Sequence, residues 1–172
     1  DDLGLGQAHL AGAAGLDALD DGLRLDARQT GVEGLDRRRR AGDPRVEGSG
    51  VWRFRDLVLP GPGPIVTHPE GNTPLYRRET VARWVGLEDL ALKHEGENPT
   101  GSFKDRGMTV AVTQAVRAGA TAVACASTGD TSAAAALYAA YLRPNIKSAV
   151  LLPHKKVTPQ QLAQPLGAGA AV

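Results

Sequence analysis

The chain has few of the residues that build disulfides, metal sites or membrane anchors. Its single cysteine, Cys125, excludes an internal disulfide framework and any cysteine-rich zinc site. No apolar run approaches the roughly 20 residues that a membrane-spanning helix needs, and no charged-then-apolar leader is present. The histidines are not spaced as a metal triad. We therefore expect no metal site, no membrane as a partner and a cytoplasmic location.

Neither sign of charge predominates. Lys and Arg together number 20, Asp and Glu 19, and the net charge is +1. This balance gives no reason to expect a nucleic acid as a partner. At 172 residues the chain has the length of one domain or of part of a larger one. Because it starts at Asp1 and residues 162–172 stop within a helix-then-strand pattern, we expect a fragment.

The composition changes sharply near residue 50. Residues 1–50 contain no aromatic residue, Ile, Met or Lys, and they are rich in Gly and Arg. Such a mixture cannot bury much apolar surface, which predicts a low-complexity, disordered segment. From Val51 onward the pattern is that of an ordinary folded protein, so we predict a division into residues 1–50 and 51–172.

The second part alternates strand-like and helix-like segments. The pattern predicts strands at 90–95, 121–126 and 147–152, and helices at about 103–118, at 131–142 and from near Thr158. Gly119 offers a C-cap for the first of these helices. This alternation predicts an α/β fold with a parallel sheet and helical crossovers. Loops that follow parallel strands open at the carboxyl edge of the sheet, where ligands of such folds collect.

One lysine, Lys104, stands at a predicted strand-to-helix junction. Ser102, with Asp105 three residues later, fits a capping box that would start the helix and place Lys104 in its first turn. There the helix macrodipole opposes a cation and favours the neutral amine, which is the form that attacks a carbonyl. The alternative is a solvent-facing lysine that pairs with Asp105 or Glu97.

A second loop precedes the helix predicted at 131–142. Its hydroxyls and backbone N–H groups can bind an anion such as a substrate carboxylate. The alternative is that these residues only cap the helix. Because this loop and Lys104 both follow predicted parallel strands, we expect them to face one crevice. The residues concerned are Ser127, Thr128, Gly129 and Thr131.

The residues around the lysine also carry a resemblance to a known family. Asn98-Pro-Thr-Gly-Ser-Phe-Lys-Asp-Arg-Gly-Met108 resembles the lysine segment of the pyridoxal-phosphate enzymes of the tryptophan-synthase-β type, and most closely that of the threonine synthases. Three further segments agree in the same order: Val51–Leu57, Glu70–Leu75 and Ala126–Ala134. The resemblance covers residues 51–172 and implies the N-terminal part of a catalytic domain, an incomplete fold-type II domain.

The resemblance implies a lyase that converts O-phosphohomoserine and water to threonine and phosphate in threonine biosynthesis. Pyridoxal 5′-phosphate would be the cofactor, bound to Lys104 as a Schiff base, with a small amino-acid substrate and, at full length, a homodimer. Three alternatives stay open. They are a threonine or serine dehydratase, a cysteine-synthase-like β-replacement enzyme, and a non-catalytic remnant.

The same resemblance implies roles for individual residues. Lys104 would be the catalytic residue, with Phe103 packed beside the cofactor ring. Asp130 would lie at the cofactor, where relatives have an asparagine whose amide donates to the ring oxygen. A carboxylate cannot donate when it is ionised, so Asp130 should weaken cofactor binding, although it suits a helix N-cap. Substrate would be bound by Asn72, Thr73, Ser127, Thr128, Gly129 and Thr131.

Overall fold

The structure, a computed structural model, describes residues 43–142, 144–154 and 156–172. The predicted low-complexity segment lies outside the described residues as far as residue 42, so the division near residue 50 stays a prediction. From Asp43 onward the chain forms one compact unit. That unit opens with helix α2 (Pro44–Gly48), where the Asp43 side chain accepts a hydrogen bond from the backbone N–H of Arg45.

A short turn of 3₁₀ helix, η2 (Trp52–Phe54), and helix α3 (Arg55–Val58) follow. Trp52 is completely buried, and its indole Nε1 donates to Thr109 Oγ1 at 2.7 Å. The same hydroxyl donates to the Val66 carbonyl at 2.6 Å. One threonine thus ties two distant segments of chain to helix α5 (Lys104–Arg117).

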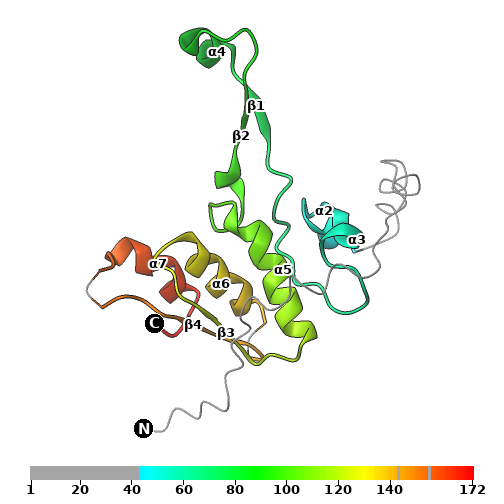
Figure 1. The fold of residues 1–172 in the computed structure, drawn as a ribbon, viewed down its shortest axis with the longest axis vertical. Helices are drawn as coiled ribbons and strands as arrows, with labels where there is room; N and C mark the ends of the chain where they lie inside the picture. Colours follow the sequence, from blue (N-terminus) through cyan, green and yellow to red (C-terminus); the bar gives the residue numbers. More distant parts are fainter. Residues whose placement is uncertain (1–42, 143, 155) are drawn as a thin grey trace, which may run out of the picture. The chain divides into compact units, whose positions relative to one another are not determined.

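Strands β1 (Leu75–Arg77) and β2 (Ala91–Lys93) form a separate antiparallel ribbon, with helix α4 (Glu79–Val85) between them. In Figure 1 this ribbon and α4 extend away from the other helices and strands. The prediction that the strand before Lys104 belongs to the parallel sheet is therefore wrong. Parallel sheets bury both faces of their strands, whereas all three residues of β2 are exposed.

The parallel part of the prediction is confirmed for the next two strands. β3 (Ala122–Cys125) and β4 (Lys147–Val150) pair in parallel with Ala122 opposite Lys147, and helix α6 (Asp130–Ala140) makes the crossover. Helix α5 packs against α6 (Figure 1). The run of alanines makes α6 the most buried helix, because small side chains allow close packing on every side. The mixed α/β class is thus as predicted.

Helix α7 (Pro159–Gly167) closes the described chain, starting where the sequence indicates. Thr158 and Gln161 form a reciprocal capping box there. Beyond it, Ala171 forms a parallel bridge with Ala149 on β4. Within the ranges that the structure covers, no helix is long and apolar enough to cross a membrane.

Candidate active site

Lys104 is the first residue of α5, as the sequence predicts, but the helix start is built differently from a capping box. The Ser102 hydroxyl accepts from the Lys104 backbone N–H at 3.2 Å. Asp105 does not reach back to Ser102. Its Oδ2 instead accepts from Thr100, from the backbone N–H at 3.0 Å and from the hydroxyl at 2.7 Å. Thr100 lies in the turn before the helix. Its two donors bind the Asp105 carboxyl in place of the Ser102 backbone N–H, which a capping box would use.

The Lys104 side chain is half-buried and lies over the ring of Phe103, with Nζ 4.6 Å from the ring centroid. Phe103 itself is 55% exposed, so the amine and the ring are open on one side. Asp105 is completely buried, and Glu97 accepts from Tyr76 instead. Within the described ranges Lys104 thus forms no ion pair with either carboxylate, which argues against the alternative of a paired surface lysine.

Arg106, two residues after Lys104, donates two hydrogen bonds to the Glu95 carboxylate. Arg106 Nε lies 2.7 Å from Glu95 Oε2, and Nη2 lies 2.9 Å from Oε1. Asn98 Nδ2 donates to Oε2 of the same carboxylate at 3.0 Å. These donors, Arg106 first, lower the pKa of Glu95 to about 2. The pair fixes the 3₁₀ turn η3 (Glu95–Glu97) against the first turn of α5.

The predicted substrate residues Asn72 and Thr73 differ in their burial and in their contacts with this hydrogen-bond network. Thr73 is buried; its hydroxyl donates to Glu95 at 3.0 Å and accepts from Arg106 at 3.2 Å. Asn72 is exposed and has a φ of 51°, in the left-handed region. Thr73 therefore anchors the loop, and Asn72 is the residue that the loop presents.

The predicted anion loop lies at the start of α6. Gly129 is the N-cap residue, without a side-chain cap, and its N–H donates to Ser127 Oγ at 3.4 Å. Thr128 and Thr131 are half-buried. Asp130 is exposed and is the first helical residue, so the prediction that it serves as the N-cap is wrong. Its carboxylate still lies where the helix macrodipole favours an anion.

The two halves of the predicted site begin neighbouring helices, since α5 and α6 pack together and both start with a candidate residue. Among the described residues, no hydrogen bond joins the Lys104 side chain to residues 127–131. A shared crevice therefore stays a prediction. Sequence reasoning missed Glu95, Arg106 and Asn98 as organisers of the site. The signal was available for Arg106 and Asn98, which lie within the lysine motif itself.

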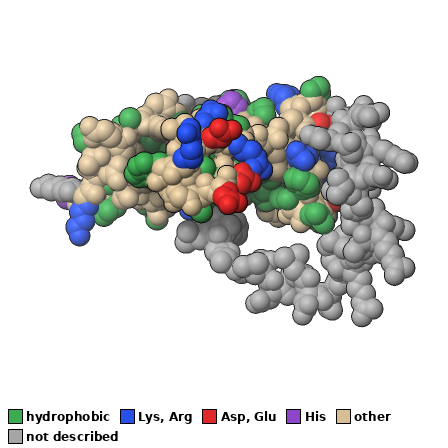
Figure 2. Space-filling model, turned by 90° about the horizontal axis from the view of Figure 1, so that it is seen from above, with side chains coloured by type: hydrophobic (Ala, Val, Ile, Leu, Met, Phe, Trp, Pro, Cys, Tyr) green, Lys and Arg blue, Asp and Glu red, His purple; other side chains and the backbone are tan. Residues whose placement is uncertain are grey.

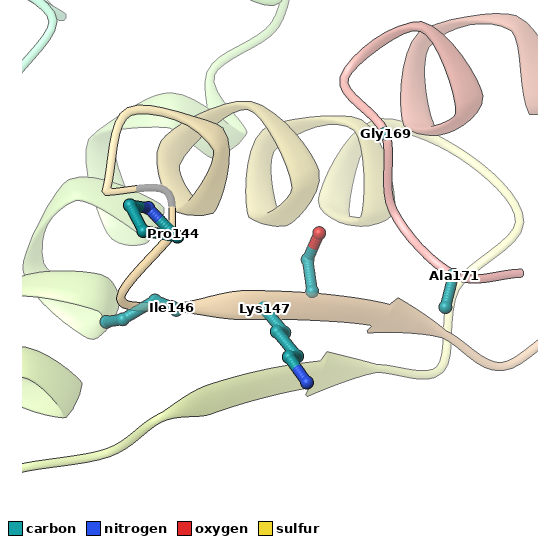
Figure 3. A pocket seen from close by; sticks show the side chains of 6 residues that line it. Pro144, Ile146, Lys147, Gly169 and Ala171 are labelled. Atoms are coloured by element: carbon teal, nitrogen blue, oxygen red, sulfur yellow. The ribbon is translucent and has the colours of Figure 1, made fainter. Parts of the chain in front are cut away.

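Two surface features lie away from these residues. A cavity of about 340 Å³ lies between β4 and the segment after α7, and none of the predicted site residues lines it (Figure 3). Figure 2 looks onto the end that carries α4, where acidic and basic side chains are intermingled. Arg77 on β1 and Asp89, just before β2, form an ion pair. That face therefore presents charge of mixed sign.

Comparisons with known proteins support the family suggested by the lysine motif. Residues 66–172 match the model of a family described as pyridoxal-phosphate dependent enzyme. The threonine synthase of Methanosarcina acetivorans is 51% identical over 128 residues, which are 74% of this chain and 31% of that protein. The threonine synthase of Methanocaldococcus jannaschii is 50% identical over 124 residues, 72% of this chain and 30% of that protein. The resemblance is confirmed, and the chain spans about a third of the length of these relatives.

Solved structures give the same fold. The crystal structure of a pyridoxal 5′-phosphate-dependent aspartate racemase matches with a TM-score of 0.52 and 27% identity, covering 58% of this chain and 31% of that one. The serine racemase from Dictyostelium discoideum matches with a TM-score of 0.52 and 26% identity, covering 59% of this chain and 33% of that one.

Proposed function

Because the chain belongs to the family of pyridoxal-phosphate dependent enzymes, we propose that the complete protein is a threonine synthase. Such a lyase converts O-phosphohomoserine and water to threonine and phosphate. One observation carries the proposal: in a chain that is 51% identical to a threonine synthase over 128 residues, Lys104 lies at the start of α5, half-buried and with no ion pair in the described chain. The proposal extends to a small amino-acid substrate and, at full length, to a homodimer in the cytoplasm.

The residues present fit pyridoxal 5′-phosphate, the cofactor of this family. A Schiff base needs a primary amine that is free of a carboxylate partner, and Lys104 satisfies this condition in the described part of the chain. The exposed ring of Phe103, close to the Lys104 amine, offers an aromatic surface beside it. When bound, the cofactor supplies a sink for the electron pair left on a carbon next to the substrate amino group.

The chain's own residues would bind the substrate and move protons. The Lys104 amine would take up and return protons. The hydroxyls of Ser127, Thr128 and Thr131 and the free N–H groups at the start of α6 would bind the substrate carboxylate or phosphate. Asn72 would contact the substrate from the opposite loop. Thr73, whose hydroxyl is shared by Glu95 and Arg106, would hold that loop in place.

Chemical trapping tests the assignment of the lysine. The complete protein is incubated with pyridoxal phosphate and reduced with borohydride, and its peptides are analysed by mass spectrometry. We expect a pyridoxyl group on the peptide that contains Lys104, lost in Lys104→Arg and kept in Lys147→Arg, a control on β4. A label on other lysines alone, or none at all, would contradict the proposal and favour a non-catalytic remnant.

Product analysis then separates the candidate reactions. Phosphate and threonine formed from O-phosphohomoserine support a threonine synthase. A 2-oxo acid formed from threonine or serine would instead indicate a dehydratase, and consumption of a sulfur nucleophile would indicate a β-replacement enzyme. Because solved racemase structures are similar to this chain, the interconversion of serine enantiomers is also measured. That activity would count against a threonine synthase.

A further inference from the structure

Beneath Lys104 the protein buries two carboxyl groups and a tyrosine that the proposed function does not use. Glu70, Asp105 and Tyr138 are each completely buried. They come from three different parts of the chain: the loop before β1, the first turn of α5, and α6. Two carboxylates at one buried place repel each other, and each loses its hydration. Their hydrogen-bond partners differ, and this difference bears on the protonation state of each carboxyl.

Glu70 is surrounded by donors. Its Oε1 accepts from the Ser49 hydroxyl at 2.5 Å and its Oε2 from the His68 backbone N–H at 2.9 Å. The Thr67 hydroxyl lies 3.0 Å and 3.1 Å from the two oxygens. Tyr138 donates to Oε2 at 3.0 Å. A carboxylate satisfies all these donors at once, whereas a carboxylic acid would bring a proton that faces other protons.

Asp105, by contrast, has hydrogen-bond donors at only one of its two carboxyl oxygens. Its Oδ2 accepts two hydrogen bonds from Thr100, but its Oδ1 is buried without a hydrogen-bond partner among the described residues. An ionised oxygen left in that position would cost free energy, because nothing replaces the water that it lost. Burial raises the pKa of the Asp105 carboxyl, the hydrogen bonds from Thr100 and the nearby Tyr138 hydroxyl act to lower it, and the nearby charge of Glu70 raises it, so that the net shift is upward.

Tyr138 connects the two carboxyls. Its hydroxyl has a single proton, which it donates to Glu70. Burial raises the pKa of Tyr138 and the nearby Asp105 carboxyl helps to raise it, so the phenol keeps that proton. Towards Asp105 its oxygen can therefore only accept. An ionised Asp105 would meet lone pairs there, while a protonated Asp105 would donate to them.

We propose that Asp105 is a positioning residue that works as the neutral acid: its proton would lie on Oδ1, which has no hydrogen-bond partner in the described chain, and would face the oxygen of Tyr138, which donates to Glu70. This series of groups would join α5, α6 and the loop before β1, and Thr100 ties the same carboxyl to the turn before Lys104. That Lys104 is the residue so positioned rests on the proposed function. Arg106, in the same turn of α5, is paired with Glu95, and its charge also interacts with that of Glu70.

The neutral state has a definite signature in stability. A carboxyl whose pKa is higher in the folded than in the unfolded chain binds more protons when folded, so its contribution to stability falls as pH rises above the unfolded pKa of about 3.9. The fall ends when pH passes the folded pKa. An ionised, hydrogen-bonded aspartate would show the reverse, with stability rising over the same range of pH.

Asp105→Asn separates these cases, because an amide is neutral, keeps an acceptor for Thr100 and can donate to Tyr138. Urea unfolding of the 172-residue chain is measured from mildly acidic to neutral pH. At neutral pH we expect the unfolding midpoint of Asp105→Asn to equal or exceed that of the wild type, with the gap growing as pH rises. A lower midpoint that falls further behind with rising pH would overturn the proposal.

Two further measurements extend the test, and the first of them is independent of the cofactor. Carboxyl ¹³C NMR should show Asp105 titrating well above about 3.9, and in Tyr138→Phe that midpoint should shift because the acceptor is gone. Titration at an ordinary aspartate value would contradict the proposal. Borohydride labelling of Lys104 should be retained better in Asp105→Asn than in Asp105→Ala. Equal loss of label in both would remove the positioning role, even if the protonation state were as proposed.

Discussion

Gly50 lies so close to the backbone of Asn72 that a β-carbon on Gly50 would come within 1.9 Å of the Asn72 nitrogen. The Gly50 N–H also donates to the Glu70 carbonyl at 2.7 Å. The segment before Trp52 is thus in close backbone contact with the loop that contains the candidate substrate residue Asn72. A backbone contact of this kind cannot be relieved by turning a side chain.

Gly50→Ala should therefore be strongly destabilising. We expect a loss of at least about 2 kcal/mol in the free energy of unfolding, since overpacking a rigid contact typically costs about 1–3 kcal/mol and here the opposing atoms belong to the backbone. Urea unfolding monitored by Trp52 fluorescence measures it. Gly48→Ala is the matched control, because no atom lies within 4 Å of a β-carbon there. Equal stability of the two variants would contradict the close approach.

Thr109→Val should cost about 1–3 kcal/mol although it keeps the shape of the side chain. The hydroxyl of Thr109 accepts from Trp52 Nε1 and donates to the Val66 carbonyl. The substitution leaves the buried Trp52 N–H unpaired and leaves the Val66 carbonyl with only the longer hydrogen bond from Thr113, at 3.4 Å. Thermal or urea unfolding measures the loss. Thr121→Val, at an exposed position, is the control and should change stability little. A near-neutral Thr109→Val would mean that these hydrogen bonds contribute nothing net.

Arg106→Lys should weaken the protein most near neutral pH. The pKa of Glu95 falls from 4.5 to about 2 on folding, so its stabilisation is present above about pH 4.5 and is lost as pH falls towards 2. Because the pair is partly exposed, we expect about 1 kcal/mol rather than the full value of the shift. Lysine keeps the charge but not the two-pronged hydrogen bonding.

The comparison of unfolding free energies at about pH 7 and at about pH 3 checks this expectation, with the difference between wild type and variant shrinking at the lower pH. Arg77→Lys is the control, since Arg77 and Asp89 pair on the surface with side chains that are 64% and 74% exposed. If the variant loses the same unfolding free energy at both pH values, the effect comes from packing of the arginine and not from its pairing with Glu95.

Asp130→Asn should raise the affinity for pyridoxal phosphate. Asp130 is exposed at the first position of α6 and does not cap the helix, so its replacement leaves the fold intact. The amide can donate a hydrogen bond where the carboxylate cannot, and it removes a negative charge beside an anionic cofactor. Equilibrium titration followed by absorbance measures the affinity. Glu79→Gln, an exposed acid in the first turn of α4, should leave it unchanged; an unchanged or weaker affinity in Asp130→Asn would refute the account.

Much of this protein was determined by the sequence alone. The helices at 104–117 and 130–140, the strands that flank the second, and the helix start near Thr158 all follow from residues near one another in the chain. Their signals are local, because helix hydrogen bonds and caps join residues three or four positions apart. The position of Lys104 in the first turn of its helix belongs to this class.

Only the tertiary structure decided the rest. The antiparallel pairing of β2 with β1, the grip of Arg106 on Glu95, and the buried group of Glu70, Asp105 and Tyr138 depend on contacts between residues far apart in sequence. Glu70 and Tyr138 are 68 positions apart. A charged residue in a loop has the pattern of a solvated residue until the chain closes around it. The protonation state of such a group is therefore a property of the packed molecule, set by the donors and acceptors that folding brings to it.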